Sequence, residues 1–227
     1  MPLLKYSSIY DYVKTFSSAK LHIPKWYKDI SPLYGEPSFR PKKMTVKACS
    51  PFLDAFTTGY TVTLPGDVIF EYEDITNTVI GTWGVPDIRI MSTRDLESMG
   101  HEFPWPDNYE KLSFAWNLGA SFSLPKGYSA LLTHPLNRAD LPFYTFSGVV
   151  DDFTVYSGEV PFLLKKGFRG TIPMGTPIAQ IIPFKREDWK SLEDKEVLVE
   201  ARLSYLNSAS VFKGWYKNNI WKKKTYE

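Results

Sequence analysis

Two short stretches decide how this chain folds: Ser147-Gly-Val-Val-Asp151 and Gly175-Thr-Pro-Ile-Ala-Gln-Ile-Ile182. Each contains a glycine followed by β-branched or small apolar residues, a pattern typical of strands rather than of helices. We therefore expect residues 148–151 and 175–182 to be neighbouring strands in a closed β structure whose interior is filled by side chains.

Strand patterns recur on both sides of these stretches, and turn residues separate them at short intervals. This spacing indicates an antiparallel barrel or sandwich. The further predicted strands are residues 46–49, 60–64, 68–72, 78–83, 114–118, 128–133, 144–150, 155–163 and 178–184. A Pro-Gly-Asp turn at 65–67 is a hairpin signature, so we expect strands 60–64 and 68–72 to pair with each other.

Helical patterns lie mainly toward the two ends of the chain. Apolar residues at helical spacing predict a helix over 7–19, Pro24 opens a second turn, and Pro51 begins a third that ends before Gly59. A further helical turn is expected at 93–99, and helix returns after Arg186. We expect one domain over residues 1–227, with a helical arm at 1–43, a β-rich body at 44–186 and a helical segment at 187–227.

The composition is that of an ordinary globular protein. Of 227 residues, 43% are hydrophobic and 23% are charged, which excludes a wholly disordered chain, and the formal net charge of +2 argues against a polyanion binder. Cys49 is the only cysteine, so neither an intrachain disulfide nor a cysteine-ligated zinc site is possible. Without a signal-peptide pattern or a run of about 18 apolar residues, we expect neither signal-directed secretion nor a membrane contact.

Charge is distributed unevenly near the end of the chain. Residues 187–200 carry six acids against Lys190 and Lys195, whereas residues 201–226 carry six basic residues and no acid. Trp215, Tyr216 and Trp221 lie in the basic part. Such aromatic residues stack on bases in single-strand binders, but at helical spacing they more often pack against protein. We therefore expect interface residues here and no nucleic-acid partner.

Several motifs carry a resemblance to a known family. Ser147–Asp151 with the run 156–160 (Tyr-Ser-Gly-Glu-Val) resembles the third motif of dUTPases, and 174–182 resembles their fourth. Leu124-Pro-Lys-Gly-Tyr128 is similar to a turn of that family, and 54–60 matches its first motif more faintly. The resemblance implies the β-clip barrel of dUTPases and dCTP deaminases, which in the enzymes implies a trimer.

The chain departs from that family where phosphate is held. The family has a serine-glycine pair after an arginine, whereas this chain reads Thr133-His-Pro-Leu-Asn-Arg138, and it lacks the glycine-rich C-terminal arm. Residues 23–27, 49–55 and 133–138, together with the Trp215…Trp221 ending, also resemble an uncharacterised family of tailed bacteriophages. That second resemblance implies a phage origin, with the protein in the virion or in the host cytoplasm.

The candidate ligand-binding residues are His134, Asn137, Arg138, Tyr156 and Gln180. Arg138 could grip phosphate through its planar guanidinium, or could be locked to a nearby carboxylate in a structural loop. Gln180 could serve a ligand, although a buried amide more often pairs with the backbone.

Asp151 is the candidate catalytic residue. With Asp152 it could orient a water molecule, or it could end a strand as a turn residue. His22 and His101 lack partners at metal-ligand spacing, so no metal site is expected.

Two functions follow. The first is a non-catalytic, virus-encoded assembly or binding protein without a cofactor, which associates with itself or with other phage proteins. The alternative is a nucleotide-binding or nucleotide-hydrolysing enzyme in which Asp151 orients water, Tyr156 stacks on the sugar, Arg138 holds phosphate and Mg²⁺ neutralises charge.

Overall fold

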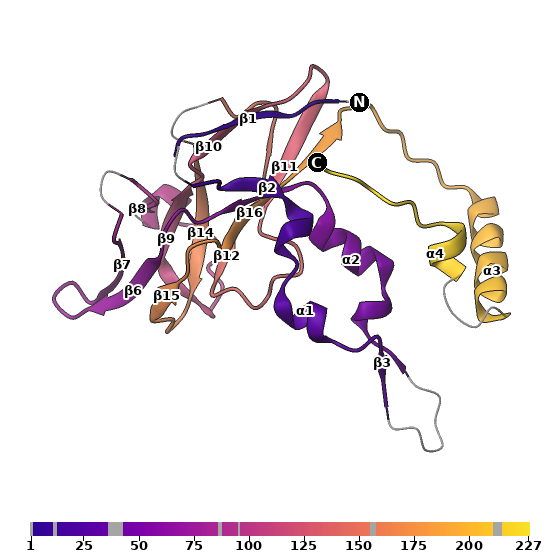
Figure 1. Ribbon diagram of the computed structural model, residues 1–227, viewed down its shortest axis with the longest axis horizontal. Coiled ribbons are helices and arrows are strands. Elements are labelled where there is room, and N and C mark those ends of the chain that lie inside the picture. The colour runs from indigo at the N-terminus through magenta and orange to yellow at the C-terminus, as the bar shows by residue number, and fades with distance from the viewer. Residues whose placement is uncertain are drawn as a thin grey trace.

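The architecture is mainly β with a few short helices, as the sequence predicts (Figure 1). A computed structural model describes residues 2–10, 13–35, 43–85, 88–94, 96–154, 158–210 and 215–227. The largest sheet has five strands in the order β13 (Gly148–Val150), β11 (Tyr128–Thr133), β16 (Pro177–Lys185), β5 (Tyr60–Thr63) and β2 (Phe16–Ser18). Both motif stretches thus form strands of one sheet, but β11 lies between them.

The remaining described strands form four smaller sheets. A four-stranded sheet has the order β12 (Phe143–Thr145), β14 (Glu159–Lys165), β9 (Tyr109–Asn117) and β8 (Met91–Arg94). A three-stranded sheet contains β15 (Gly170–Ile172), β6 (Val68–Glu73) and β7 (Thr78–Trp83). The two-stranded sheets are β1 (Lys5–Ser8) with β10 (Ala120–Ser123), and β3 (Leu33–Tyr34) with β4 (Lys43–Met44).

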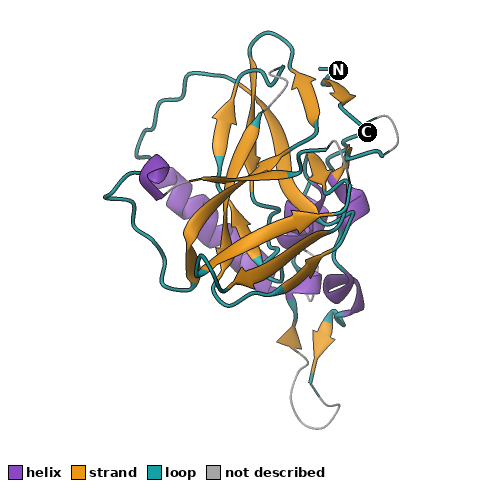
Figure 2. Ribbon diagram, turned by 90° about the vertical axis from the view of Figure 1, so that its left-hand side faces the viewer, coloured by secondary structure: helices purple, strands orange, loops and turns teal. Residues whose placement is uncertain are grey.

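The sheets are open, so the expectation of a closed barrel is wrong. Each sheet among the described residues ends in edge strands, and the strands of the different sheets cross one another around the interior (Figure 2). One apolar core joins them. Trp116 and Phe162, both of the four-stranded sheet, stack at 3.7 Å between ring centroids, and they pack in the same core as Phe70 of the three-stranded sheet and Ile181 of the five-stranded sheet. The body is thus held together by burial between open sheets rather than by ring closure.

The helices are η1 (Ala19–His22), α1 (Lys25–Asp29), η2 (Val46–Ala48), α2 (Ser50–Thr57), η3 (Leu96–Met99), α3 (Lys195–Ser210) and α4 (Trp215–Asn219). The turns predicted at Pro24 and Pro51 are confirmed as α1 and α2, and helix is confirmed after Arg186. The strand predicted at 46–49 is wrong, because the Thr45 hydroxyl accepts a hydrogen bond from the Lys47 N–H and caps a 3-10 turn. No helix in the described ranges is both long and apolar enough to cross a bilayer.

The helix predicted over 7–19 is also wrong. Lys5–Ser8 pairs with β10, and Phe16–Ser18 pairs with β5. Phe16 is buried and stacks between the rings of Tyr6 and Tyr60. Pairing and packing with strands from distant parts of the chain outweigh the helical spacing of the apolar residues.

Two further strand predictions fail in their pairing. Strands β5 and β6 do not form a hairpin, because β5 pairs with β16 and β2, whereas β6 pairs with β7 and β15. The Pro-Gly-Asp turn therefore carries the chain between sheets. Likewise the single strand predicted over 144–150 is divided into β12 and β13, which belong to different sheets. Of the predicted strand 155–163, residues 155–157 lie outside the described part.

Candidate functional site

Gln180 is the most deeply buried of the candidate site residues. It lies in β16, and its side chain is 2% exposed. Its Oε1 accepts a hydrogen bond from the Leu136 N–H at 2.9 Å, and its Nε2 donates to the carbonyls of Ala55 at 2.9 Å and Thr58 at 2.6 Å. The side chain thus ties the end of α2 to the loop after β11. All of its hydrogen-bonding groups have partners in the backbone, which is the structural alternative expected from the sequence.

A close backbone approach supports this junction. Gly59, one residue beyond the C-cap of α2, has φ of +74°, and a Cβ there would lie 2.1 Å from the carbonyl oxygen of Ile181. Only glycine fits at such a distance in this conformation. The contact brings the end of α2 against β16 beside Gln180.

His134 begins the loop that follows β11, and both of its ring nitrogens are engaged. The Thr145 N–H donates to Nδ1 at 3.2 Å, and Nε2 lies 3.2 Å from the carbonyl oxygen of Arg138. An amide N–H can donate only to an unprotonated ring nitrogen, so we assign the neutral tautomer with the proton on Nε2. Burial lowers the pKa of His134 below its ordinary value of 6.5, which agrees with a neutral ring that braces the loop.

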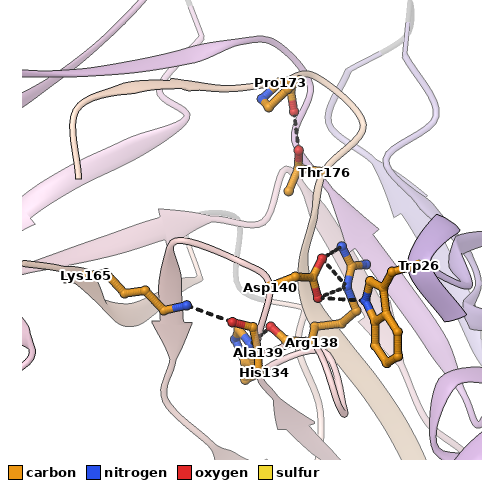
Figure 3. A network of polar contacts seen from close by, with 8 residues as sticks. All are labelled: Trp26, His134, Arg138, Ala139, Asp140, Lys165, Pro173 and Thr176. Atoms are coloured by element: carbon orange, nitrogen blue, oxygen red, sulfur yellow. Dashed lines mark hydrogen bonds and ion pairs between the residues drawn. The ribbon is translucent and has the colours of Figure 1, made fainter.

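Arg138 is held by Asp140 in the same loop (Figure 3). Its Nε and Nη2 donate to the two carboxylate oxygens at 2.9 Å each, and the Arg138 side chain is 12% exposed. Trp26 of α1 adds an Nε1–H bond to Asp140 at 3.3 Å, and Lys165 binds the Ala139 carbonyl at 2.7 Å. Burial raises the pKa of Asp140, but the hydrogen bond and charge of Arg138 outweigh it and hold that pKa below its ordinary value.

Asn137 completes this loop as a turn residue. Its φ is +58°, a left-handed conformation that asparagine tolerates better than most residues, and its side chain is exposed. The turn it forms returns the chain toward Asp140. The structure therefore presents the loop 134–140 as one internally bonded unit.

A small internal space lies between the loop and η1. It has a volume of about 10 Å³ and is lined by nine residues, namely Ala19, His22, Phe56, Thr61, Pro135, Leu136, Arg138, Pro177 and Gln180. This volume corresponds to about one water molecule, far below that of a nucleotide. Burial lowers the pKa of His22, and the positive charges of Arg138 and Lys28 lower it further.

Asp151 lies away from this loop. Because Val150 pairs with Ala130 and Gly148 pairs with Leu132, Asp151 lies beside the start of β11, whereas Arg138 follows its end. The β11 strand has six residues, and at about 3.3 Å per residue its two ends are more than 15 Å apart. The structure therefore brings His134, Arg138 and Gln180 together but not Asp151. Tyr156 lies outside the described residues.

The surroundings of Asp151 do not fit Mg²⁺. Its Oδ1 accepts a hydrogen bond from the Ser129 hydroxyl at 2.6 Å, and its Oδ2 lies 3.2 Å from Arg186 Nη1. Both oxygens are engaged, and the guanidinium places a positive charge where a divalent cation would bind. Among the described residues there is no group of three or more His, Cys, Asp or Glu side chains that could hold a metal ion.

The candidate interface residues are in the C-terminal segment, which returns to the body. Trp221 donates from Nε1 to Asp54 Oδ2 of α2 at 2.9 Å, and Lys224 pairs with the same oxygen. Tyr216 is 44% exposed, and Trp215 begins α4, with its side chain outside the described part. Sequence reasoning missed Asp54 as the anchor, although an acid on α2 complements the basic end of the chain.

Comparison with known proteins adds little to this geometry. No family model and no curated protein sequence matches the chain. Among solved structures, the chain is similar to a mutant dUTPase from phage phi11 of S. aureus, at 17% identity and a TM-score of 0.26, over 48% of this chain and 99% of that one. A likeness at this level carries no argument about the fold or the function. The described structure defines the class no more finely than a mainly β protein with open sheets.

Proposed function

We propose that this protein is a non-catalytic assembly or binding module that works by associating with itself or with other proteins. The observation that carries the proposal is the surface of α3. Six of its apolar side chains are between 55% and 73% exposed, namely Val197, Leu198, Val199, Leu203, Tyr205 and Leu206. Contiguous exposed apolar surface of this kind marks a protein-interaction site.

The polar residues of α3 strengthen this proposal. Glu196, Glu200 and Ser204 follow one another at intervals of four and form a polar stripe, while Arg202 lies between Leu198 and Leu206 among the apolar side chains. From Lys195 to Leu206, Ser204 alone is half-buried, and the others are exposed. Contacts within the chain therefore half-bury one residue of the polar stripe, while Val197, Leu198, Val199, Leu203 and Leu206 stay more than half exposed. Burying exposed apolar side chains such as these against another chain is favourable.

The loop of residues 134–140 supports a structural role rather than a ligand site. The polar groups of Gln180 and His134 bond to the backbone, and Arg138 donates from Nε and Nη2 to Asp140. A phosphate at Arg138 would have to share the guanidinium with the Asp140 carboxylate, whose negative charge would repel it. The scaffold motifs that resemble dUTPases, and the longer resemblance to a tailed-phage family, support a phage virion or accessory protein on a dUTPase-like core.

The alternative is nucleotide binding or hydrolysis, which needs Asp151 and Arg138 around one ligand. Their positions at opposite ends of β11 speak against such a site within one copy. An experiment with two readouts separates the functions. The full chain is sedimented over a range of micromolar concentrations, and it is also incubated with Mg²⁺ and a panel of deoxynucleoside triphosphates.

We expect a mass above that of one chain, no pyrophosphate release and no nucleotide-dependent shift of the melting temperature. The double variant Leu203→Glu/Leu206→Glu should sediment as a monomer, because it places charge on the apolar face. Its matched control, Leu203→Met/Leu206→Met, keeps the face apolar and should still associate. Pyrophosphate release would overturn the non-catalytic proposal, and a monomer at every concentration would overturn its self-association.

A further inference from the structure

The C-terminal tail, defined as residues 221–227, occupies a specific acceptor site on the body. Besides the two contacts to Asp54, the Ser18 hydroxyl donates to the Tyr226 carbonyl at 2.7 Å. The Tyr60 hydroxyl donates to the Glu227 carbonyl at 3.3 Å, and the Tyr60 ring meets the Tyr226 ring edge-on at 6.1 Å between centroids. The acceptor site therefore draws on the end of β2, on α2 and on β5.

Charge and burial make this acceptor selective for such a tail. The Asp54 side chain is 15% exposed, and it receives both an indole N–H and a lysine ammonium group. A half-buried carboxylate with a cation and a neutral donor is a stronger contact than an exposed surface pair. Burial raises the pKa values of the Tyr60 and Tyr226 hydroxyls, as expected for rings packed into one contact.

Residues 187–194 form an exposed connector between the body and α3. Residues 187–194 are all exposed, and among the described residues no hydrogen bond or ion pair joins 188–194 to a strand or helix of the body. In Figure 1, α3 and α4 lie to one side of the sheets, and the tail runs back from them. Eight extended residues span at most about 28 Å, so this connector allows α3 to be placed in more than one way.

We propose that the acceptor site around Asp54 binds the tail of a second copy of this chain, so that two copies exchange their C-terminal segments. The inference rests on the proposed assembly function. Exchange keeps every contact of the tail, because an identical acceptor receives an identical tail, and it is made twice in a two-fold dimer. It also brings the connectors and the exposed faces of both α3 helices to the junction between the copies, where apolar surface can be buried.

The test uses cysteines on the two sides of the contact. In a Cys49→Ser background, Ser18→Cys and Tyr226→Cys are made in separate chains, co-refolded from urea at equal concentration and treated with a short bis-maleimide. Exchange predicts a covalent dimer in the mixture and much less of it in either variant alone. A second pair, Ser18→Cys and Glu227→Cys, leaves the Asp54 anchor in place and repeats the test if Tyr226→Cys impairs folding, which a thermal melt reveals.

The outcomes are distinct. A cross-linked dimer in the mixture supports exchange. If the mixture gives no dimer, while one chain carrying both cysteines gives an internal cross-link and runs as a monomer on a denaturing gel, exchange is overturned. Sedimentation of the same samples then separates two failures: associated chains leave self-association standing without exchange, whereas monomers overturn self-association as well as exchange.

Discussion

Replacing Gln180 by methionine tests whether its side chain is a structural tie or a ligand group. Methionine has nearly the same volume and no hydrogen-bonding capacity comparable to the amide, so the change leaves the packing and removes three hydrogen bonds. The Leu136 N–H and the carbonyls of Ala55 and Thr58 would lose their partner. Ligand binding would play no part in the result.

The magnitude follows from those three bonds. A hydrogen bond contributes a net of about 1 kcal/mol, and leaving a buried partner unsatisfied adds to the loss, so we expect a decrease of about 3 kcal/mol in the free energy of unfolding. For a chain of this size that corresponds to about 6–12 °C in melting temperature. The m-value should stay constant, because the fold and its buried surface are retained.

Urea denaturation followed by tryptophan fluorescence measures the effect. Lys185→Met on the same strand is the matched control, since that side chain is 62% exposed and should change stability by less than about 0.5 kcal/mol. If Gln180→Met left the urea midpoint as unchanged as the control does, Gln180 would not be a structural tie. The interpretation of the loop 134–140 as structural would then be refuted.

Three further predictions concern the loop, the junction and the tail. The folded state holds His134 neutral with a lowered pKa, so its contribution to stability is complete above pH 6.5 and is lost as the pH falls through the folded-state pKa. The urea midpoint should therefore fall on acidification. It should fall less in the His134→Asn variant. An unchanged difference between the two proteins would contradict this. Gly59→Ala should destabilise the fold by more than about 3 kcal/mol through its clash with a backbone carbonyl, whereas Gly175→Ala, at a similar positive φ in open space, should cost about 1–2 kcal/mol in the same assay; equal costs would count against the close approach. Asp54→Ala should release the tail, so that trypsin cleaves the basic residues after Trp221 faster while the urea midpoint of the body stays the same; unchanged cleavage would show that Asp54 does not anchor it.

The local sequence pattern predicted the positions of several strands but not the strands with which they pair. Residues 78–83 and 128–133 are strands with the predicted bounds: the first pairs along its length with β6, and the second pairs with β16 and β13. The hairpin expected at residues 60–72 is absent, because a Pro-Gly-Asp turn is equally compatible with a passage from one sheet to another. Pairing depends on distant strands such as β16, which a local pattern does not contain.

The candidate site shows the same division. The sequence indicated Arg138 and Gln180 as candidates, and it left open whether Arg138 binds phosphate or a nearby carboxylate and whether Gln180 serves a ligand or the backbone. Their partners decide that question, and two of these, Ala55 and Thr58, lie more than 120 residues away in the chain. The position of Asp151 could not be predicted either, because the register of β13 on β11 places it at the other end of the strand from Arg138.

Amide hydrogen exchange in α3, measured as a function of protein concentration, tests the central claim most directly. If another chain covers the apolar face, the amides of residues 195–210 should be strongly protected at high concentration and should exchange rapidly on dilution. The Leu203→Glu/Leu206→Glu variant should exchange rapidly at every concentration. Protection that is independent of concentration, and equal in the two proteins, would contradict an assembly role for this helix.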